Sequence, residues 1–308
     1  MKRNLLLGVV ALAVLGAGAA WLLTAPQRLG DDVLASLPKG DARQGEVVFW
    51  AGGCASCHAA EGAQGDDKLK LGGGLQLVTP FGTFTAPNIS PHRQDGIGRW
   101  TRAEFANAMK TGTGRAGQHY YPAFPYTSYA RMSLEDVADL QAYLLTLPAV
   151  AGDAGPHELA FPFNIRRGLG LWKRLYLSDA PVVPEPVSEA GVPVDRALFD
   201  RGRYLVEGPG HCGECHTPRN AIGGPDKNRW LAGAAAPTGD GVIPNITPSD
   251  NGLGSWTTED IAYYLETGFT PEFDAVGGEM VAVQENMARL TARDRTAIAT
   301  YLKAIPTH

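Results

Sequence analysis

Apolar and polar positions divide the chain into two stretches with different patterns. Residues 5–23 form an unbroken apolar run that follows Lys2 and Arg3. A run of 19 residues fits either a secretory signal or one membrane-spanning helix. Ala17-Gly18-Ala19 resembles a cleavage site, but the apolar run continues beyond it. We therefore favour an uncleaved anchor formed by residues 5–23, within an N-terminal segment of residues 1–30.

Beyond residue 40, apolar residues recur at helical spacing in three segments, and this plan occurs twice. The expected helices are 43–52, those beginning at Thr101 and Ser133, 196–207, and those beginning at Thr257 and Thr291. Each of the four hydroxyl starts is followed three residues later by an acidic residue, as in a capping box. Gly112 and Gly268 are placed to end the second helices. No segment has a convincing strand pattern, so the predicted fold class is all-α.

Short motifs repeat at a nearly constant spacing. Pro-Asn-Ile-Ser-Pro at 87–91 returns as Pro-Asn-Ile-Thr-Pro at 244–248, an offset of 157 residues. Gly-Ile-Gly-Arg-Trp-Thr at 96–101 returns as Gly-Leu-Gly-Ser-Trp-Thr at 252–257, an offset of 156. A repeat of this kind predicts two tandem domains built on one plan.

The tandem plan places the two domains at residues 36–178 and 195–308. Residues 179–194 are rich in proline and form the expected linker. Residues 161–173 are too apolar for a free linker, so we expect them to wrap back onto the first domain.

Composition narrows the classes of function. The chain has 308 residues and a net charge of −5, so it has no basic field that would recruit nucleic acid. Its 38 glycines and 22 prolines suit a loop-rich fold wrapped around a cofactor that supplies part of the core.

All four cysteines lie in two copies of one pattern, Cys-x-x-Cys-His. The copies are Cys54-Ala-Ser-Cys57-His58 and Cys212-Gly-Glu-Cys215-His216, 158 residues apart. A zinc ribbon places its two cysteine pairs roughly 15–20 residues apart, and a disulfide needs no histidine. A thioredoxin-type pair would lie in a β-α-β context, which neither copy has. The pattern therefore predicts two covalently attached c-type haems, with each histidine as the proximal iron ligand.

The ligand on the other side of each iron determines the redox behaviour. Met132 lies just before the third helix of the first repeat, where a distal ligand is expected, and His119 is a rival on the same loop. In the second repeat Met280 follows two glycines that would let the backbone approach a haem, and Met287 is its rival. We predict Met132 and Met280 as the distal ligands.

Asn88 and Asn245 belong to the repeated Pro-Asn-Ile motif. Their side chains would either hydrogen-bond near a haem propionate or form an Asx-turn. The sequence does not separate these two interpretations.

The motifs carry a family resemblance that covers nearly all of the chain after residue 40. The chain resembles bacterial di-haem cytochromes c related to the cytochrome subunits of membrane-bound alcohol and gluconate dehydrogenases. The resemblance rests on both Cys-x-x-Cys-His sites, the Pro-Asn-Ile motifs, Tyr-Tyr-Pro-Ala-Phe-Pro-Tyr at 120–126 and Phe-Pro-Phe-Asn-Ile-Arg at 161–166. The resemblance implies two class I cytochrome c-like domains. It also implies electron transfer from a periplasmic dehydrogenase to a cytochrome, the quinone pool or a terminal oxidase, on the periplasmic side of the bacterial inner membrane.

Two features depart from the dehydrogenase subunits. Those subunits typically carry three haem sites and a ligand methionine in Tyr-Pro-Ala-Met-Pro-Tyr, whereas this chain has two sites and Phe124 at that position. The resemblance therefore transfers no ligand to position 124.

We expect an electron carrier without catalytic activity of its own. The alternative is a di-haem enzyme such as a cytochrome c peroxidase or a thiosulfate-oxidising cytochrome. Such an enzyme needs an open haem and, for peroxide, an acid or base above it. The loop around Met280 shows no clear distal acid, although Glu279 and Glu285 are nearby.

Overall fold

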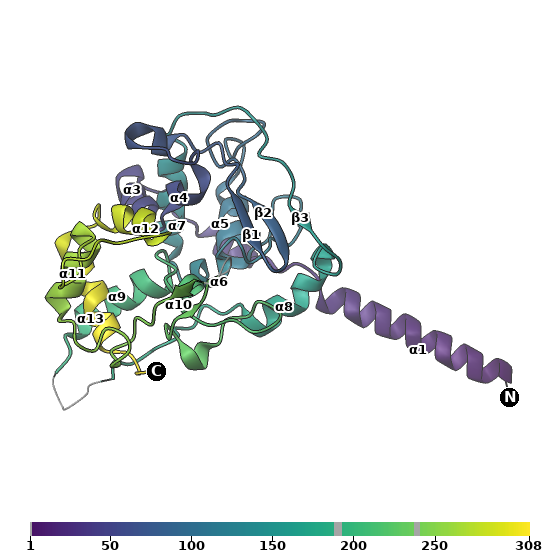
Figure 1. Ribbon diagram of the computed structural model, residues 1–308. Coiled ribbons are helices and arrows are strands. Elements are labelled where there is room, and N and C mark those ends of the chain that lie inside the picture. Colours follow the sequence, from purple (N-terminus) through teal and green to yellow (C-terminus); the bar gives the residue numbers. More distant parts are fainter. Residues whose placement is uncertain (1, 188–192, 237–240) are drawn as a thin grey trace.

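The computed structural model describes residues 2–187, 193–236 and 241–308 (Figure 1). Part of the predicted linker, residues 188–192, lies outside these ranges. The elements are, in chain order, α1 (Lys2–Leu23), α2 (Asp31–Ala35), α3 (Ala42–Ala51), α4 (Cys54–His58), η1 (Gly65–Leu69), β1 (Gln76–Thr79), β2 (Gly82–Thr85), α5 (Arg102–Thr111), α6 (Tyr126–Tyr129), α7 (Leu134–Leu144), β3 (Glu158–Leu159), η2 (Arg166–Gly168), α8 (Leu169–Tyr176), α9 (Arg196–Glu207), α10 (Gly213–His216), η4 (Lys227–Arg229), β4 (Ala234–Ala235), β5 (Val242–Ile243), α11 (Thr258–Thr267), α12 (Met280–Met287) and α13 (Ala292–Lys303).

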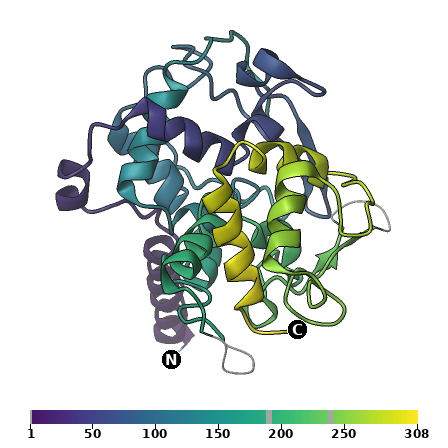
Figure 2. The ribbon, with the colours of Figure 1, turned by 90° about the vertical axis from the view of Figure 1, so that its left-hand side faces the viewer.

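Two hydrophobic cores organise the chain beyond α1. In the first unit, α3 and α5 pack on α7 around residues such as Phe49, Leu140 and Leu144. In the second unit, α9 and α11 pack on α13 around Phe199, Ile298 and other apolar residues. Figure 2 shows the yellow α13 lying between the two green helices that cover it. The predicted three-helix plan is therefore present twice.

The predicted helix starts and stops are confirmed. The Thr101 hydroxyl accepts from the Glu104 backbone N–H, and the Glu104 carboxylate accepts from the Thr101 backbone N–H at 2.8 Å. Thr257 and Asp260 form the same capping box at the start of α11. Gly112 ends α5 with a φ of 60°, in the left-handed region that glycine adopts without strain.

A close helix crossing depends on one glycine in each unit. A Cβ atom on Gly45 of α3 would lie 1.9 Å from the Asp139 carbonyl oxygen of α7. A Cβ atom on Gly202 of α9 would lie 1.9 Å from the Ala297 carbonyl oxygen of α13. The two helices of each pair therefore approach to a distance that no residue larger than glycine permits.

The structure also contains short strands, which the sequence pattern did not indicate. β1, β2 and β3 form an antiparallel sheet in that order, with Gln76 opposite Thr85 and Gly82 opposite Leu159. β4 and β5 form a second, two-stranded pair. These strands have two to four residues, too few to give a periodic signal. β1, β2, β4 and β5 lie in the loops between a Cys-x-x-Cys-His stretch and the next long helix, whereas β3 lies between α7 and α8.

Residues 166–176 pack on the first unit. The buried Lys173 ammonium donates to the Thr111 and Gly112 carbonyls at 2.7 and 2.6 Å, at the end of α5. The Trp172 ring contacts Tyr126, and its indole N–H donates to the Ile222 carbonyl of the second unit at 2.9 Å. This segment therefore also joins the two units.

Helix α1 projects from the rest of the molecule as a single exposed rod (Figure 1). Its stretch Asn4–Leu23 is 20 residues long with a mean hydropathy of 2.3, so it is long and apolar enough to cross a membrane. A signal sequence has the same length and composition, so the helix by itself does not distinguish the two.

Candidate functional site

Each predicted proximal histidine is held by a backbone carbonyl from the Pro-Asn-Ile motif of its own unit. His58 Nδ1 donates to the Pro87 carbonyl at 2.7 Å, and His216 Nδ1 donates to the Pro244 carbonyl at 2.8 Å. Because Nδ1 carries the proton, Nε2 is the free nitrogen of the neutral ring. Burial lowers the pKa of both histidines, and the hydrogen bond to proline offsets this only in part. Both rings are therefore neutral, and the Nε2 of each is left free as a ligand atom.

Cys54 and Cys57 lie on the short helix α4, Cys215 lies on α10, and Cys212 lies just before α10. None of the four forms a disulfide. Burial, and then the neighbouring cysteine of the same pair, raises the pKa of Cys54 and of Cys212 to about 12. These groups are thiols rather than thiolates, which does not suit a thioredoxin-type nucleophile. No group of three or more His, Cys, Asp or Glu side chains in the described part of the chain is arranged to hold a bare metal ion. The donor set fits covalent haem.

The asparagines of the Pro-Asn-Ile motifs form Asx-turns. Asn88 Oδ1 accepts from the Ser90 backbone N–H at 2.9 Å, and its amide donates to the Val150 and Gly152 carbonyls. Asn245 Oδ1 accepts from the Thr247 backbone N–H at 2.8 Å. These bonds hold the loop whose proline carbonyl orients the histidine. The prolines are functional residues that the sequence interpretation missed, although their repeated place in the motif was a signal for them.

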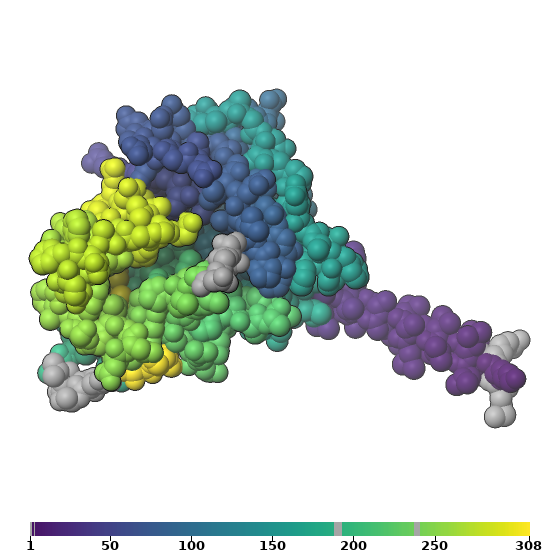
Figure 3. Space-filling view, viewed as in Figure 1, coloured from purple at the N-terminus to yellow at the C-terminus, as the bar shows by residue number. Residues whose placement is uncertain are grey.

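The two Cys-x-x-Cys-His stretches lie against each other across the boundary between the units. His211 Nε2 donates to the Gly52 carbonyl at 3.2 Å, so the residue before one stretch contacts the loop before the other. Burial, and then the charges of Cys215 and Glu279, raise the pKa of Cys57. In the space-filling view, the surface is hollowed where the yellow and green second unit meets the blue first unit (Figure 3).

The third residue of each stretch holds the opposite unit. Asn286 of α12 donates to the Ser56 hydroxyl at 2.8 Å. The Thr127 and Ser128 hydroxyls of α6 donate to Glu214 Oε1 at 2.7 and 2.9 Å. The contact is reciprocal because α6 and α12 occupy the same place in the two units. Nothing local in the sequence indicates these bonds.

Glu214 is a charged group at this boundary. Burial alone would raise its pKa, but Arg219 and the Thr127 and Ser128 hydroxyls more than offset burial, so the pKa lies below its ordinary value. The Arg219 guanidinium forms an ion pair with the same carboxylate.

Replacing Glu214 by alanine is expected to lower the free energy of unfolding by roughly 2–4 kcal/mol, because two buried hydroxyls lose a charged acceptor. Guanidinium unfolding of the haem-loaded protein measures the change. Glu61→Ala, at an exposed position, is the control and should change stability by less than about 0.5 kcal/mol. Equal stability of the two variants would show that the Glu214 contact does not join the units.

The structure buries the methionines to different extents. Met132 is 2% exposed, lies in the first core just before α7, and its Cγ approaches Gly208 at the end of α9. Met280 is half-buried at the start of α12 and packs against the second core. Met287 is 5% exposed and belongs to that core.

The rival ligand His119 has another partner. Its ring is buried, and Nε2 donates to the Thr24 carbonyl at 2.9 Å, just after α1. The ring therefore helps to attach the end of α1 to the first unit.

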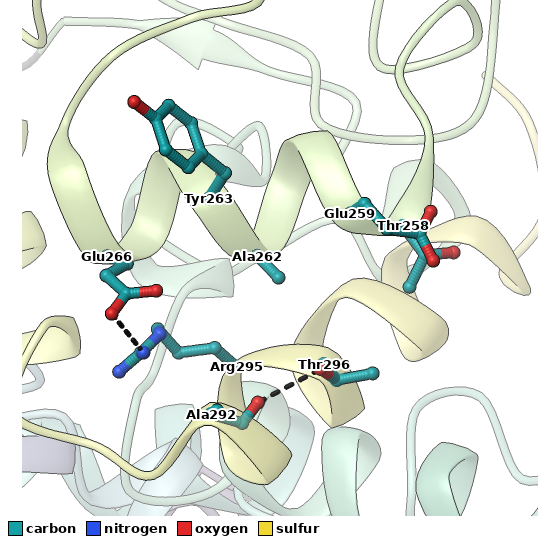
Figure 4. A pocket seen from close by; sticks show the side chains of 8 residues that line it. All are labelled: Thr258, Glu259, Ala262, Tyr263, Glu266, Ala292, Arg295 and Thr296. Carbon is teal, nitrogen blue, oxygen red and sulfur yellow. Dashed lines mark hydrogen bonds and ion pairs between the residues drawn. The ribbon is translucent and has the colours of Figure 1, made fainter.

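A separate pocket of about 240 Å³ lies between α11 and α13 (Figure 4). Arg295 and Glu266 form an ion pair of 2.9 Å on its wall. None of the six Cys-x-x-Cys-His residues lines it, so it does not belong to the site described above.

Comparison with known proteins agrees with this site. The family model described as cytochrome c matches residues 42–148. A di-haem c-type cytochrome of Cereibacter sphaeroides is 49% identical over 99% of this chain and 99% of its own length.

Dehydrogenase subunits are more distant and longer. The fructose dehydrogenase cytochrome subunit of Gluconobacter japonicus is 36% identical over 88% of this chain, and the gluconate 2-dehydrogenase cytochrome c subunit of Pantoea cypripedii is 35% identical over 85%. This chain spans only 54% and 59% of their lengths. With the match over the full length of the Cereibacter protein, the chain belongs to the di-haem c-type cytochromes and carries two covalently bound haem c groups.

Proposed function

We propose that this protein relays electrons through its two haems, from a periplasmic dehydrogenase to a downstream cytochrome, the quinone pool or a terminal oxidase. The haem irons supply the redox chemistry by cycling between the ferric and ferrous states. The proposed domains are 36–178 and 195–308, each with one haem. Cys54 and Cys57 attach the first haem and Cys212 and Cys215 the second, with His58 and His216 as proximal ligands.

The observation that carries this proposal is the contact between the two attachment stretches. The His211–Gly52 hydrogen bond and the Ser56–Asn286 hydrogen bond hold one stretch against the other unit. Attachment points held together across the boundary suit passage of an electron from one haem to the other. A carrier with separate partners for its two haems needs such a fixed internal path.

The proposed distal ligands are Met132 and Met280. Both lie in the segment that precedes the last long helix of their unit. Met132 is buried and Met280 is half-buried. A thioether ligand raises the reduction potential of a haem, which suits electron transfer.

Low-temperature EPR and near-infrared magnetic circular dichroism of the oxidised protein test the ligands. We expect two low-spin haems with His/Met ligation. Met132→Ala and Met280→Ala should each remove half of the methionine-to-iron charge-transfer intensity and lower one of the two reduction potentials. Met109→Leu is the matched control, because Met109 is buried in α5 and its counterpart in α11 is Leu265.

Other spectra would assign the site differently. If Met287→Leu removed the signal and Met280→Ala did not, Met287 would be the ligand of the second haem. A stable high-spin haem in the unaltered protein would favour the di-haem enzyme, and peroxide and thiosulfate would then be tested as substrates.

The relatives support a proposal for the partner and the location. Cytochrome subunits of fructose and gluconate dehydrogenases are among them, so we propose a dehydrogenase of this general class as the donor. We also propose that α1 remains as a membrane anchor, with the haem units on the periplasmic side, because its end is fixed to the first unit by the His119–Thr24 bond.

A further inference from the structure

The end of α1 is bonded rigidly to the first unit. Arg174 of α8 donates from Nε to the Leu23 carbonyl at 2.7 Å. Arg167 donates from Nε to the Thr24 hydroxyl at 2.9 Å, and its guanidinium lies 4.0 Å from the centre of the Trp21 ring. Both arginines thus donate to oxygen atoms at the C-terminal end of α1, where the last backbone carbonyls have no partner within the helix. The direction in which α1 leaves the molecule is therefore determined by α8 and the turn before it.

The chain after α1 continues this attachment. The Thr113 hydroxyl donates to the Gln27 carbonyl at 2.6 Å, and the Leu29 backbone N–H donates to Asn107 Oδ1 at 2.8 Å. Gly170 of α8 packs so closely on Thr24 that a Cβ atom would lie 2.4 Å from the Thr24 carbonyl oxygen. A membrane crossed by α1 must therefore meet one particular face of the first unit.

That face carries large apolar side chains exposed to solvent. Phe161 is 77% exposed, Ile165 52%, Leu171 50% and Leu175 70%. Phe161 and Ile165 lie just before η2, and Leu171 and Leu175 lie on α8. The arginines that hold the end of α1 belong to η2 and α8. Figure 1 shows α8 beside the end of α1. We call these four residues the apolar collar. It continues from Trp21, which is 67% exposed at the end of α1.

We propose that the apolar collar lies in the interfacial layer of the bilayer that α1 crosses, so that α8 is a second membrane contact. This inference rests on the proposed anchoring by α1. Trp21 and Phe161 are aromatic side chains of the kind that gather at the membrane–water boundary. Arg167 and Arg174 lie beside them and place positive charge at the level of the lipid phosphates.

A lipid surface fits the collar better than a protein partner does, because the collar is continuous with α1. The described side chains of α1 are exposed, and they face lipid if the helix is inserted. Arg174 and His119 are hydrogen-bonded to the Leu23 and Thr24 carbonyls, so they would then lie close to the bilayer surface. Two membrane contacts on one rigid unit would hold both haem units in one orientation above the membrane.

Photo-cross-linking of the full-length, haem-loaded protein tests the proposal. The protein is reconstituted in vesicles of phosphatidylcholine and phosphatidylglycerol that contain a phospholipid with a photoactivated carbene precursor near its headgroup. Mass spectrometry of the peptides then locates the lipid adducts. We expect adducts on α1 and, several-fold above background, on residues 161–175. Val242 of β5 is 81% exposed and apolar, and its peptide defines the background.

A variant with serine at all four collar positions is the second measurement. Because these side chains are exposed, the haem spectrum and the α1 adducts should be unchanged, while adducts on 161–175 should fall to the Val242 level. Adducts on α1 without adducts on 161–175 in the unaltered protein would overturn the collar and leave the anchor intact. Absence of adducts on both would overturn the anchoring proposal and the collar with it. In native membranes containing the same lipid, adducts on α1 without adducts on 161–175 would assign this face to a partner subunit and overturn the collar.

Discussion

Replacing Cys212 and Cys215 together by serine is expected to leave a protein with one covalent haem instead of two. The second unit then has no thiol to form a thioether, whereas Cys54 and Cys57 of the first unit are unaltered. His216 remains bonded to the Pro244 carbonyl, so non-covalent binding could persist but would not survive denaturation. Mass spectrometry of the denatured protein and haem staining of a denaturing gel measure the loss.

The reciprocal variant, Cys54→Ser with Cys57→Ser, is the matched control and should also carry one haem. The two variants should differ in their spectra and potentials, because the units have different residues around their haems. If either double variant lost both haems, attachment in one unit would depend on the other, and the two sites would not be independent. If either kept both, the assignment of the altered site would be wrong.

Gly202→Ala is expected to destabilise the protein by about 3 kcal/mol. The added methyl group would lie 1.9 Å from the Ala297 carbonyl oxygen and 2.8 Å from Tyr301 Cβ, so α9 and α13 would have to separate. The Ala297 backbone cannot move away from the methyl group as a flexible side chain could. The Phe199 and Tyr301 rings, which pack at this crossing, would therefore lose contact. Gly45→Ala should have a similar effect in the first unit, where the methyl group would meet Asp139 and Tyr143.

The control for the glycine variants is Gly168→Ala. Gly168 has a φ of −59° and open space around its Cβ position, so alanine should be tolerated within about 0.5 kcal/mol. Guanidinium unfolding of the haem-loaded proteins, followed by circular dichroism, gives the three values. A Gly202→Ala protein as stable as the Gly168→Ala protein would contradict the close helix crossing.

Much of the fold could be predicted because its signals are local. The Thr101 and Thr257 caps, the Gly112 and Gly268 stops and the apolar helix faces depend on residues three or four positions apart. The short strands were missed for the complementary reason. β4 and β5 have two residues each and exist because of their pairing, which no periodicity in so short a segment reveals.

The candidate site divides in the same way. The Cys-x-x-Cys-His stretches were visible in the sequence because haem attachment needs three side chains within five residues. The hydrogen bond from His58 to Pro87 joins residues 29 positions apart, and that from Asn286 to Ser56 joins residues 230 apart. Such partners are identified only when the chain is folded.

By itself, the sequence determined that the protein holds two covalent haems in a repeated helical plan behind an apolar segment. Those properties depend on contiguous motifs whose chemistry does not require the rest of the chain. The tertiary structure alone decided that the two attachment stretches face each other, that Glu214 and Ser56 hold the opposite units, and that α8 is bonded to the end of α1. The physical reason is that each of these contacts joins residues 87 to 230 positions apart in the sequence, so no local pattern indicates them.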